Sequence, residues 1–304
     1  MNRYQKLISR AKKGETILMD GATGTEAERR GVPQLKNAWN GGVALTHPEI
    51  LRTIHEDYIK SGSEIIISNT FANTKHALED AQQGHNFEKF NREGIRIAIK
   101  ARDRSSKKVL VAAGISYWTW TGRKPSLVEL GKSVEIQAKI MEKTGADLIL
   151  LEMMIDIEQM LVTLDAVKKT RLPIWVGLSC IIDKDGQVIL QNGDALKEVI
   201  NQLHDKSIDA IFIMHTEIED ILPCLIELKK HWNGMVGIYP HTGSYNNQIN
   251  LSSTEWAFQN VIITEKFIHF SQEWINFGIY FIGGCCGIGV KHIQELSKIL
   301  KYRS

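Results

Sequence analysis

The feature that most limits what this chain can fold into is a repeated alternation of two kinds of segment. Eight short apolar runs are each followed by a polar or glycine-rich turn and then by a segment of helical period. The runs are apolar throughout, which is typical of strands buried on both faces of a parallel sheet. The predicted strands are Thr16–Met19, Glu64–Ser68, Val109–Gly114, Leu148–Leu151, Ile174–Ser179, Ala210–Met214, Val236–Tyr239 and Tyr280–Ile282. The predicted helices include His47–Ser61, Ser126–Thr144, Ile157–Lys169, Asp194–Lys206 and Glu217–His231.

Strands that alternate with helices build either a closed (β/α)8 barrel or an open, doubly wound sheet. We expect the barrel, because the open sheet normally carries a G-x-G-x-x-G turn after its first strand, and the stretch from Gly21 to Thr25 does not fit that spacing. A length of 304 residues suits one or two domains, and we find no linker or low-complexity segment. The sequence therefore predicts an α/β fold with one (β/α)8 TIM barrel domain over residues 1–304, of which residues 1–14 form an N-terminal helix.

Charge and hydropathy argue against several classes of partner. The 37 Lys and Arg residues nearly balance the 35 Asp and Glu residues, and no run of like charge would follow a phosphate backbone, so we expect no nucleic acid. Apolar stretches such as residues 109–113 fall far short of the roughly 20 residues that span a bilayer, so we expect no membrane segment. Residues 1–13 lack the apolar core of a secretory signal, which favours a cytoplasmic protein. Homo-oligomer formation is left open.

Polar and sulfur-containing residues stand directly after the predicted strands. In an α/β barrel the carboxyl ends of the strands meet at one rim, where the functional site is built. The residues at these positions are Asp20, Gly21, Asn69, Thr70, Phe71, Glu152, Ser179, Cys180, His215, Tyr239, His241, Cys285 and Cys286. The barrel would thus bring thiols, imidazoles and carboxylates together at one end.

A set of motifs extends over almost the whole chain. They are DGATGTE (Asp20 to Glu26), the stretch from Trp39 to Pro48, HEDYIKSGSEIIISNTF (His55 to Phe71), LLEM (Leu150 to Met153), YPHTGSY (Tyr239 to Tyr245) and GGCCG (Gly283 to Gly287) with a following His292-Ile293. With these motifs the chain resembles the homocysteine S-methyltransferase family, and GGCCG is the most specific of them. The resemblance implies a (β/α)8 barrel with a zinc ion, held by three cysteine thiolates, whose fourth position takes the homocysteine sulfur.

The resemblance makes Cys285 and Cys286 two of the zinc ligands, and the third position differs from the family pattern. Relatives carry an Asn-Cys pair after the sixth strand, and His215 falls on the position of that cysteine. Two thiolates and an imidazole are an accepted catalytic zinc set, so the predicted ligands are His215, Cys285 and Cys286. His241 stands where relatives usually have Asn, and it is a further candidate as a ligand or as a partner of one. We treat Cys180 and Cys224 as structural.

The resemblance also implies how the substrates are held. Matching carboxylates in relatives help to bind homocysteine, and Glu152 would meet its ammonium group. The residues assigned to substrate binding are Asp20, Gly21, Thr70 and Glu152. Trp39, Trp118 and Trp120 are candidates for an aromatic wall against a cationic methyl donor, since onium groups are attracted to aromatic faces. Packing over the barrel mouth is the alternative role of Trp118 and Trp120.

The predicted function is therefore that of a zinc-dependent S-methyltransferase. It would transfer a methyl group from an onium donor (S-methylmethionine, betaine or a related sulfonium) to homocysteine and form methionine. A zinc ion suits this reaction because a free thiol has a pKa near 8.5, and coordination to the metal deprotonates it. Two alternatives remain open. The enzyme could act on a different thiol, because His215 replaces a thiolate, or the chain could bind ligand without turnover.

Overall fold

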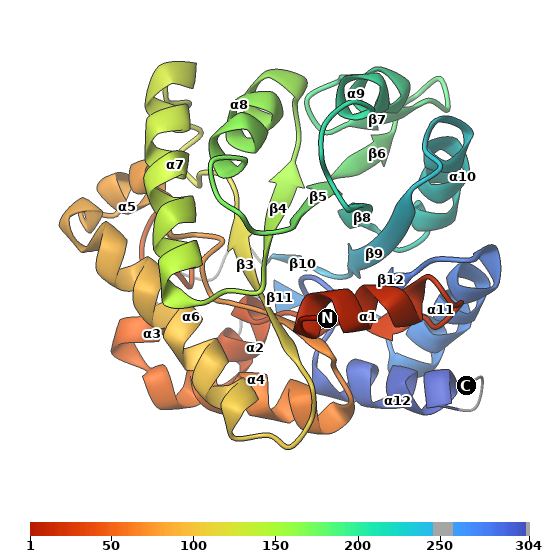
Figure 1. The fold of residues 1–304 in the computed structure, drawn as a ribbon, viewed down its shortest axis with the longest axis horizontal. Helices are drawn as coiled ribbons and strands as arrows, with labels where there is room; N and C mark the ends of the chain where they lie inside the picture. The colour runs from red at the N-terminus through yellow and green to blue at the C-terminus, as the bar shows by residue number, and fades with distance from the viewer. Residues whose placement is uncertain (246–257, 302–304) are drawn as a thin grey trace.

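The computed structural model describes residues 1–245 and 258–301, which form a sheet of eight parallel strands surrounded by helices (Figure 1). The order around the sheet is β1, β12, β9, β8, β5, β4, β3, β2. The strands are β1 (Ile17–Leu18), β2 (Ile65–Ile67), β3 (Leu110–Ile115), β4 (Leu148–Met154), β5 (Ile174–Leu178), β8 (Ala210–Glu217), β9 (Met235–His241) and β12 (Phe281–Ile282). A parallel bridge between Met19 and Ile65 joins the ends of the sheet, so it closes. The prediction of a (β/α)8 TIM barrel is confirmed.

The helices begin and end where the local sequence favours it. Ser126 and Glu129 form a capping box at the start of α7, and Gly145 ends that helix in the left-handed conformation, with φ 101°.

Among the described residues, no helix is both long enough and apolar enough to span a bilayer. The helices are α1 (Arg3–Ala11), α2 (Gly24–Arg29), α3 (Val43–Thr46), α4 (Pro48–Ser61), α5 (Lys75–Asp80), α6 (Phe87–Asp103), α7 (Leu127–Thr144), α8 (Ile157–Val167), α9 (Leu196–Leu203), α10 (Ile221–His231), α11 (Thr264–Phe277) and α12 (Val290–Lys301), with a short 3₁₀ turn at Gly84–Asn86.

Helix α1 lies across the amino-terminal end of the barrel. The hydroxyl of Tyr4 donates a hydrogen bond to Asp209 at 2.8 Å, and Arg3 pairs with Asp147 at 3.3 Å. Asp209 directly precedes β8 and Asp147 directly precedes β4, so both carboxylates mark the start of a strand. The barrel is therefore closed at this end, and the carboxyl ends of the strands are left for a site.

The sequence prediction is wrong about where β8 ends. The helix predicted at Glu217–His231 begins at Ile221, because β8 continues to Glu217 past a register shift that follows Met214. Strand β4 also continues, to Met154, past a register shift that follows Leu151. Such β-bulges bend a strand and redirect its side chains. Two antiparallel pairs were not predicted: β6 (Cys180–Ile182) with β7 (Val188–Leu190), and β10 (Ser244–Tyr245) with β11 (Phe258–Gln259).

Large aromatic side chains fill the barrel interior. The ring of Trp175 lies 4.5 Å from that of Phe281 and 5.2 Å from that of Phe212, measured between ring centroids. Gly237 on β9 provides the space for one of these rings, because a Cβ there would lie 2.2 Å from Cε1 of Phe212. The interior is thus packed to the density of a core, and it leaves no room for an added methyl group at Gly237.

This packing predicts that Gly237→Ala destabilises the barrel. Overpacking of a core typically costs about 1–3 kcal/mol, so the thermal unfolding midpoint should fall by several degrees. Gly42→Ala is the control, since the nearest side-chain atom to a Cβ there is Leu35 Cδ2 at 3.6 Å, an ordinary contact. If both variants melt with the wild-type protein in a calorimeter, the proposed packing of Gly237 against Phe212 is incorrect.

Candidate metal and substrate site

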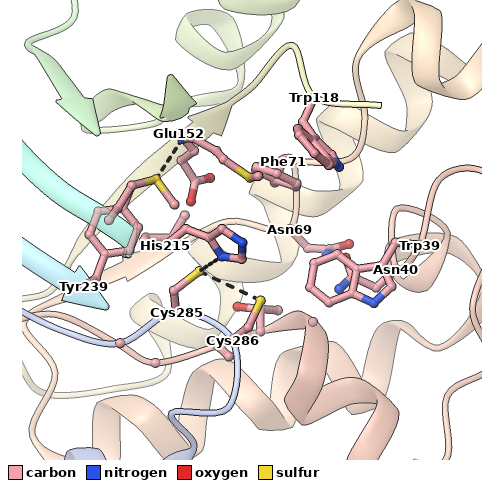
Figure 2. Close-up of a pocket in the computed structure, with 18 of the residues that line it drawn as sticks. Trp39, Asn40, Asn69, Phe71, Trp118, Glu152, His215, Tyr239, Cys285 and Cys286 are labelled. Carbon is pink, nitrogen blue, oxygen red and sulfur yellow. Dashed lines mark hydrogen bonds between the residues drawn. The ribbon is translucent and has the colours of Figure 1, made fainter. Parts of the chain in front are cut away.

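A cavity of about 250 Å³ opens at the carboxyl ends of the barrel strands, and we call it the rim cavity (Figure 2). It is formed by the ends of β2, β4, β8 and β9 and by the loops that follow β1, β3 and β12. Its lining residues are Gly21, Ala22, Thr23, Gly24, Trp39, Asn40, Ile67, Ser68, Asn69, Phe71, Trp118, Trp120, Glu152, Met153, Met214, His215, Tyr239, Phe258, Gly284, Cys285 and Cys286. Its position is the one at which α/β barrels carry their sites.

Two thiols and one imidazole meet at the rim cavity (Figure 2). Cys285 Sγ lies 3.6 Å from His215 Nδ1 and 3.9 Å from Cys286 Sγ. One ligand atom from each of the three residues lies within 4.8 Å of the other two. Tetrahedral zinc, with Zn–S distances of about 2.3 Å and Zn–N distances of about 2.1 Å, holds its ligand atoms roughly 3.6–3.8 Å apart. The spacing of the three side chains therefore fits such an ion.

The surroundings of Cys285 favour its protonated thiol over the thiolate while no cation is bound. The hydrogen bond with Cys286 and then burial raise the pKa of Cys285 well above its ordinary value, and the weaker opposing effect of His215 does not reverse this. A thiol with a raised pKa stays protonated at neutral pH, so it becomes a thiolate only when a positive charge joins it. The chemistry of this cluster thus agrees with its spacing.

Backbone contacts fix the loop that carries the two cysteines. The amide of Cys285 donates to the carbonyl of Pro240 at 2.7 Å, and the carbonyl of Cys286 accepts from the amide of Thr242 at 3.0 Å. Gly287 has φ 82°, and a Cβ at this position would lie 2.2 Å from the carbonyl oxygen of Thr242. Glycine is therefore required at Gly287 for the loop to approach β9 and turn both thiols toward His215.

A β-bulge aims His215 at the thiols. Its φ is 45°, a left-handed conformation that is uncommon for a residue other than glycine, and it lies within the register shift between Met214 and Glu217. Its carbonyl accepts a hydrogen bond from Ser179 Oγ at 2.9 Å, which fixes the bulge against the end of β5. Bulges and left-handed residues of this kind cluster at functional sites, where they redirect a side chain.

His241 lies beside this cluster and is not part of it. Its ring centroid is 4.4 Å from that of His215, with 36° between the ring planes. Its Nε2 lies 3.0 Å from a carboxylate oxygen of Glu217, and its Nδ1 is buried without a hydrogen-bond partner within the described ranges. Burial, and then the nearby His215, lower the pKa of His241. The structure therefore places His241 next to a predicted ligand, outside the group of three.

Two buried carboxyl groups lie at the same end of the barrel. Burial raises the pKa of Glu152 to about 8, and its carboxyl lies over Gly114, where a Cβ would meet Oε1 at 1.8 Å. Asp20 accepts a hydrogen bond from the amide of Ile67 at 2.8 Å, and burial raises its pKa well above the ordinary value, helped by the nearby Glu152. Within residues 1–245 and 258–301, Asp20 Oδ1, Glu152 Oε1 and the hydroxyl of Tyr239 have no hydrogen-bond partner. Buried polar atoms without a partner are uncommon in folded proteins, and Glu152 and Tyr239 line the rim cavity.

Aromatic rings line another part of the cavity. Trp120 lies 5.9 Å from Trp39 and 6.2 Å from Phe71 between ring centroids. Phe71 and Trp118, both labelled in Figure 2, pack against the barrel core. The indole N–H of Trp39 donates to a carboxylate oxygen of Glu28, which fixes that ring. We call Trp39, Phe71, Trp118 and Trp120 the aromatic wall.

The structure brings most of the residues singled out from the sequence to the cavity. The predicted residues on its lining are Gly21, Trp39, Trp118, Trp120, Glu152, His215, Cys285 and Cys286. Thr70 does not reach it: its side chain is fully buried and donates a hydrogen bond to the carbonyl of Gly114 at 2.8 Å, which ties β2 to β3. Asp20 and His241 lie behind lining residues.

Sequence reasoning missed the roles of several cavity residues. Asn69 donates to Asn40 Oδ1 at 3.2 Å, and the free Nδ2 of Asn40 lies buried among the described residues. Asn69 and Phe71 follow a predicted strand and Asn40 lies in the motif from Trp39 to Pro48, but no role in the site was predicted for any of the three. Tyr239 lay within a motif, and its hydroxyl faces Gly177, at whose position a Cβ would lie 2.7 Å away.

Comparison with known proteins places this chain among methyltransferases. A relative from Brassica oleracea var. italica, a selenocysteine Se-methyltransferase, is 25% identical and the match covers 95% of this chain and 90% of the relative. Homocysteine S-methyltransferase 2 of Arabidopsis thaliana is also 25% identical, over 95% of this chain and 94% of its own length. These identities leave room for differences at the site.

Solved structures agree with the fold. The metallated form of the homocysteine methyltransferase MmuM from Escherichia coli superimposes with a TM-score of 0.79 and 19% identity, over 98% of this chain and all of the other. The oxidised form of the same enzyme gives a TM-score of 0.79 at 20% identity. The model of the homocysteine S-methyltransferase family matches residues 17–300, nearly the whole chain. The chain therefore belongs to the homocysteine S-methyltransferase family.

Proposed function

We propose that this protein is a zinc-dependent S-methyltransferase that transfers a methyl group from an onium donor to homocysteine and forms methionine. The observation that carries the proposal is the cluster of two thiols and an imidazole, spaced for a tetrahedral ion, in the cavity of a member of this family. In the proposal His215, Cys285 and Cys286 hold the zinc, and three protein ligands leave its fourth position for substrate. Bound zinc favours the thiolate form of the acceptor, which is the nucleophile.

The buried carboxyl groups hold the amino group of the acceptor in this proposal. Glu152 lines the cavity, its Oε1 is buried without a hydrogen-bond partner among the residues described, and burial raises its pKa to about 8. A cationic ammonium group there would stabilise the ionised carboxylate, while the carboxylate would supply a charge-assisted hydrogen bond. Asp20 lies a short way behind the lining, and burial raises its pKa well above the ordinary value, so a nearby cation would be needed to ionise it. These groups would therefore orient the acceptor with its sulfur toward the two cysteines.

The aromatic wall receives the donor in the same proposal. Onium groups are attracted to the faces of Trp and Phe rings by about 0.5–2 kcal/mol for each contact, and they form no hydrogen bonds through their methyl groups. Three indoles and a phenyl ring on the cavity lining supply such faces. The wall would also exclude water from the reacting methyl group, which then transfers in line to the acceptor sulfur.

The first test of the proposal measures metal and product together. Protein purified without chelator should hold close to one zinc per chain and form methionine from homocysteine with at least one onium donor, and other small thiols should react more slowly. Cys285→Ala, Cys286→Ala and His215→Ala should each lose most of the zinc and the activity while keeping the barrel folded. Cys224→Ala is the matched control, because Cys224 is a buried thiol outside the cluster.

Zinc content below about half an equivalent in the wild-type protein would sink the proposal. So would normal zinc content in all three cluster variants. Faster turnover of another thiol would instead favour a different acceptor. The observation that favours this alternative is His215, an imidazole at a position where a thiolate is usual in the family.

Glu152→Gln should stabilise the ligand-free protein at high pH and weaken its binding of the acceptor. The pKa of Glu152 in the folded protein is about 8, above its ordinary value of 4.5, so the folded state favours the protonated carboxyl. The free energy of unfolding of the wild-type protein should therefore fall as the pH rises from 4.5 toward 8. Gln does not ionise, so the ligand-free variant should melt several degrees above wild type at pH 8.5, with little difference at pH 4.5. Homocysteine binding should weaken at least tenfold at the same time, while donor binding changes little.

Calorimetric melting curves from pH 4.5 to 8.5 and titrations with each substrate measure these effects. If the difference in melting temperature between Glu152→Gln and wild type is the same at every pH, burial does not raise the pKa of Glu152. Equal losses of acceptor and donor affinity would point to a structural role.

Trp120→Leu should raise the KM for the donor by about 2–30-fold and leave acceptor affinity unchanged, because one ring face is lost from the centre of the aromatic wall. Trp120→Phe keeps an aromatic face and should stay within a few-fold of wild type. Steady-state kinetics with each substrate varied in turn separate the two effects. An unchanged donor KM in Trp120→Leu would place the donor elsewhere.

A further inference from the structure

We infer that His241 is a positioning residue for the metal site: its ring, held by Glu217, fixes the plane of the His215 imidazole against the two thiols. The inference rests on the proposed function, since it concerns the residues that would hold the zinc. It assigns a role in metal binding to two residues, His241 and Glu217, whose ligand atoms do not belong to the cluster of three.

The need for such a residue follows from the conformation of His215. Rotation about the bond that joins an imidazole to its Cβ is broad, with no single sharp minimum. The bulge of β8 sets the backbone of His215, with φ 45°, but it does not set this rotation. A metal ligand must point a nitrogen lone pair at the ion in the plane of the ring, so a loosely held ring loses affinity.

The neighbouring ring supplies the missing constraint. The centroids of His241 and His215 are 4.4 Å apart and the planes are inclined by 36°, so His241 covers one face of His215. The Nδ1 atom of His215, on the edge of its ring, lies 3.6 Å from Cys285 Sγ. The ring of His241 therefore restricts rotation of His215 out of the plane in which Nδ1 faces the thiol.

His241 is itself held by Glu217. Glu217 and His241 are cross-strand partners on β8 and β9, and Nε2 of His241 lies 3.0 Å from Oε1 of Glu217. Because a carboxylate only accepts hydrogen bonds, this contact places the hydrogen of His241 on Nε2. The side chain of His241 is 14% exposed, whereas that of Glu217 is 61% exposed. The hydrogen bond with Glu217 thus lies at the solvent edge, and the ring of His241 lies inward, over His215.

The test compares two substitutions of His241 that remove different parts of the side chain. His241→Asn keeps a polar group but removes the ring, whereas His241→Phe keeps the ring and removes both nitrogens. Apparent zinc affinity is measured on full-length protein, free of any histidine tag, by competition with a chelator. The absorption spectrum of the cobalt(II) form reports the ligand geometry independently of activity.

We expect His241→Asn to weaken zinc binding by about 10–100-fold and to alter the cobalt spectrum, and His241→Phe to stay within about threefold of wild type with an unchanged spectrum. In a His215→Cys background, which has no imidazole to orient, His241→Asn should have no effect on zinc affinity. Wild-type affinity in His241→Asn would overturn the inference. An equal loss in His241→Asn and His241→Phe would also overturn it, because the nitrogen and not the ring would then matter. Equal losses in both backgrounds would show a general structural effect.

These results are distinct from failure of the proposed function. If the wild-type protein binds neither zinc nor cobalt, the proposed metal site is wrong, and the inference falls with it. If the wild-type protein binds metal but the zinc affinities of the His241 variants differ from the expected pattern, the proposed metal site is retained. The role of His241 as a positioning residue is then wrong.

Discussion

Closure of the parallel sheet is the constraint on which the rest of this structure depends. Strand β1 pairs with β12 on one side and is bridged to β2 on the other, so residues from the two ends of the chain meet at one rim. The carbonyl of Asp20 accepts from the amide of Gly284 at 3.0 Å, and the amide of Asp20 donates to Ile65 at 2.9 Å. These bonds place the loop of Cys285 and Cys286 beside the first strand, although more than 260 residues separate them.

The rim is a costly arrangement without its ligands. Within the described part of the chain, Asp20 Oδ1, Glu152 Oε1 and the hydroxyl of Tyr239 are buried and have no hydrogen-bond partner. Each unpartnered buried polar group destabilises a fold by about 1–3 kcal/mol. The barrel supports them because its opposite end and its interior are well packed, by α1 and by the rings of Trp175 and Phe281. Stability is thus concentrated away from the rim, where function needs unsatisfied groups.

Sequence patterns predicted the barrel and the identity of the clustered residues, but not the turns of backbone that aim them. The apolar runs fixed which segments are strands, and Cys285 and Cys286 followed from a specific motif. The bulge at His215 could not be predicted, because an inserted residue changes which face each following side chain occupies, and no local residue type marks it. Thr70 shows the same limit: it follows β2, yet its side chain is buried and donates a hydrogen bond to the carbonyl of Gly114.

In the proposed site, the exchange of a thiolate for His215 bears on both substrates at once. A neutral imidazole removes one negative charge from a rim that already holds the carboxyl groups of Asp20 and Glu152, so ionisation of Glu152 beside the acceptor becomes less unfavourable. The same loss of negative charge weakens the attraction for a cationic donor. Aromatic faces attract cations without carrying a net charge, so the indoles of Trp118 and Trp120 would compensate for it. In the proposed site the exchange at His215 and the aromatic wall would therefore be physically linked, because a less anionic metal centre favours a donor pocket that attracts cations without a net charge.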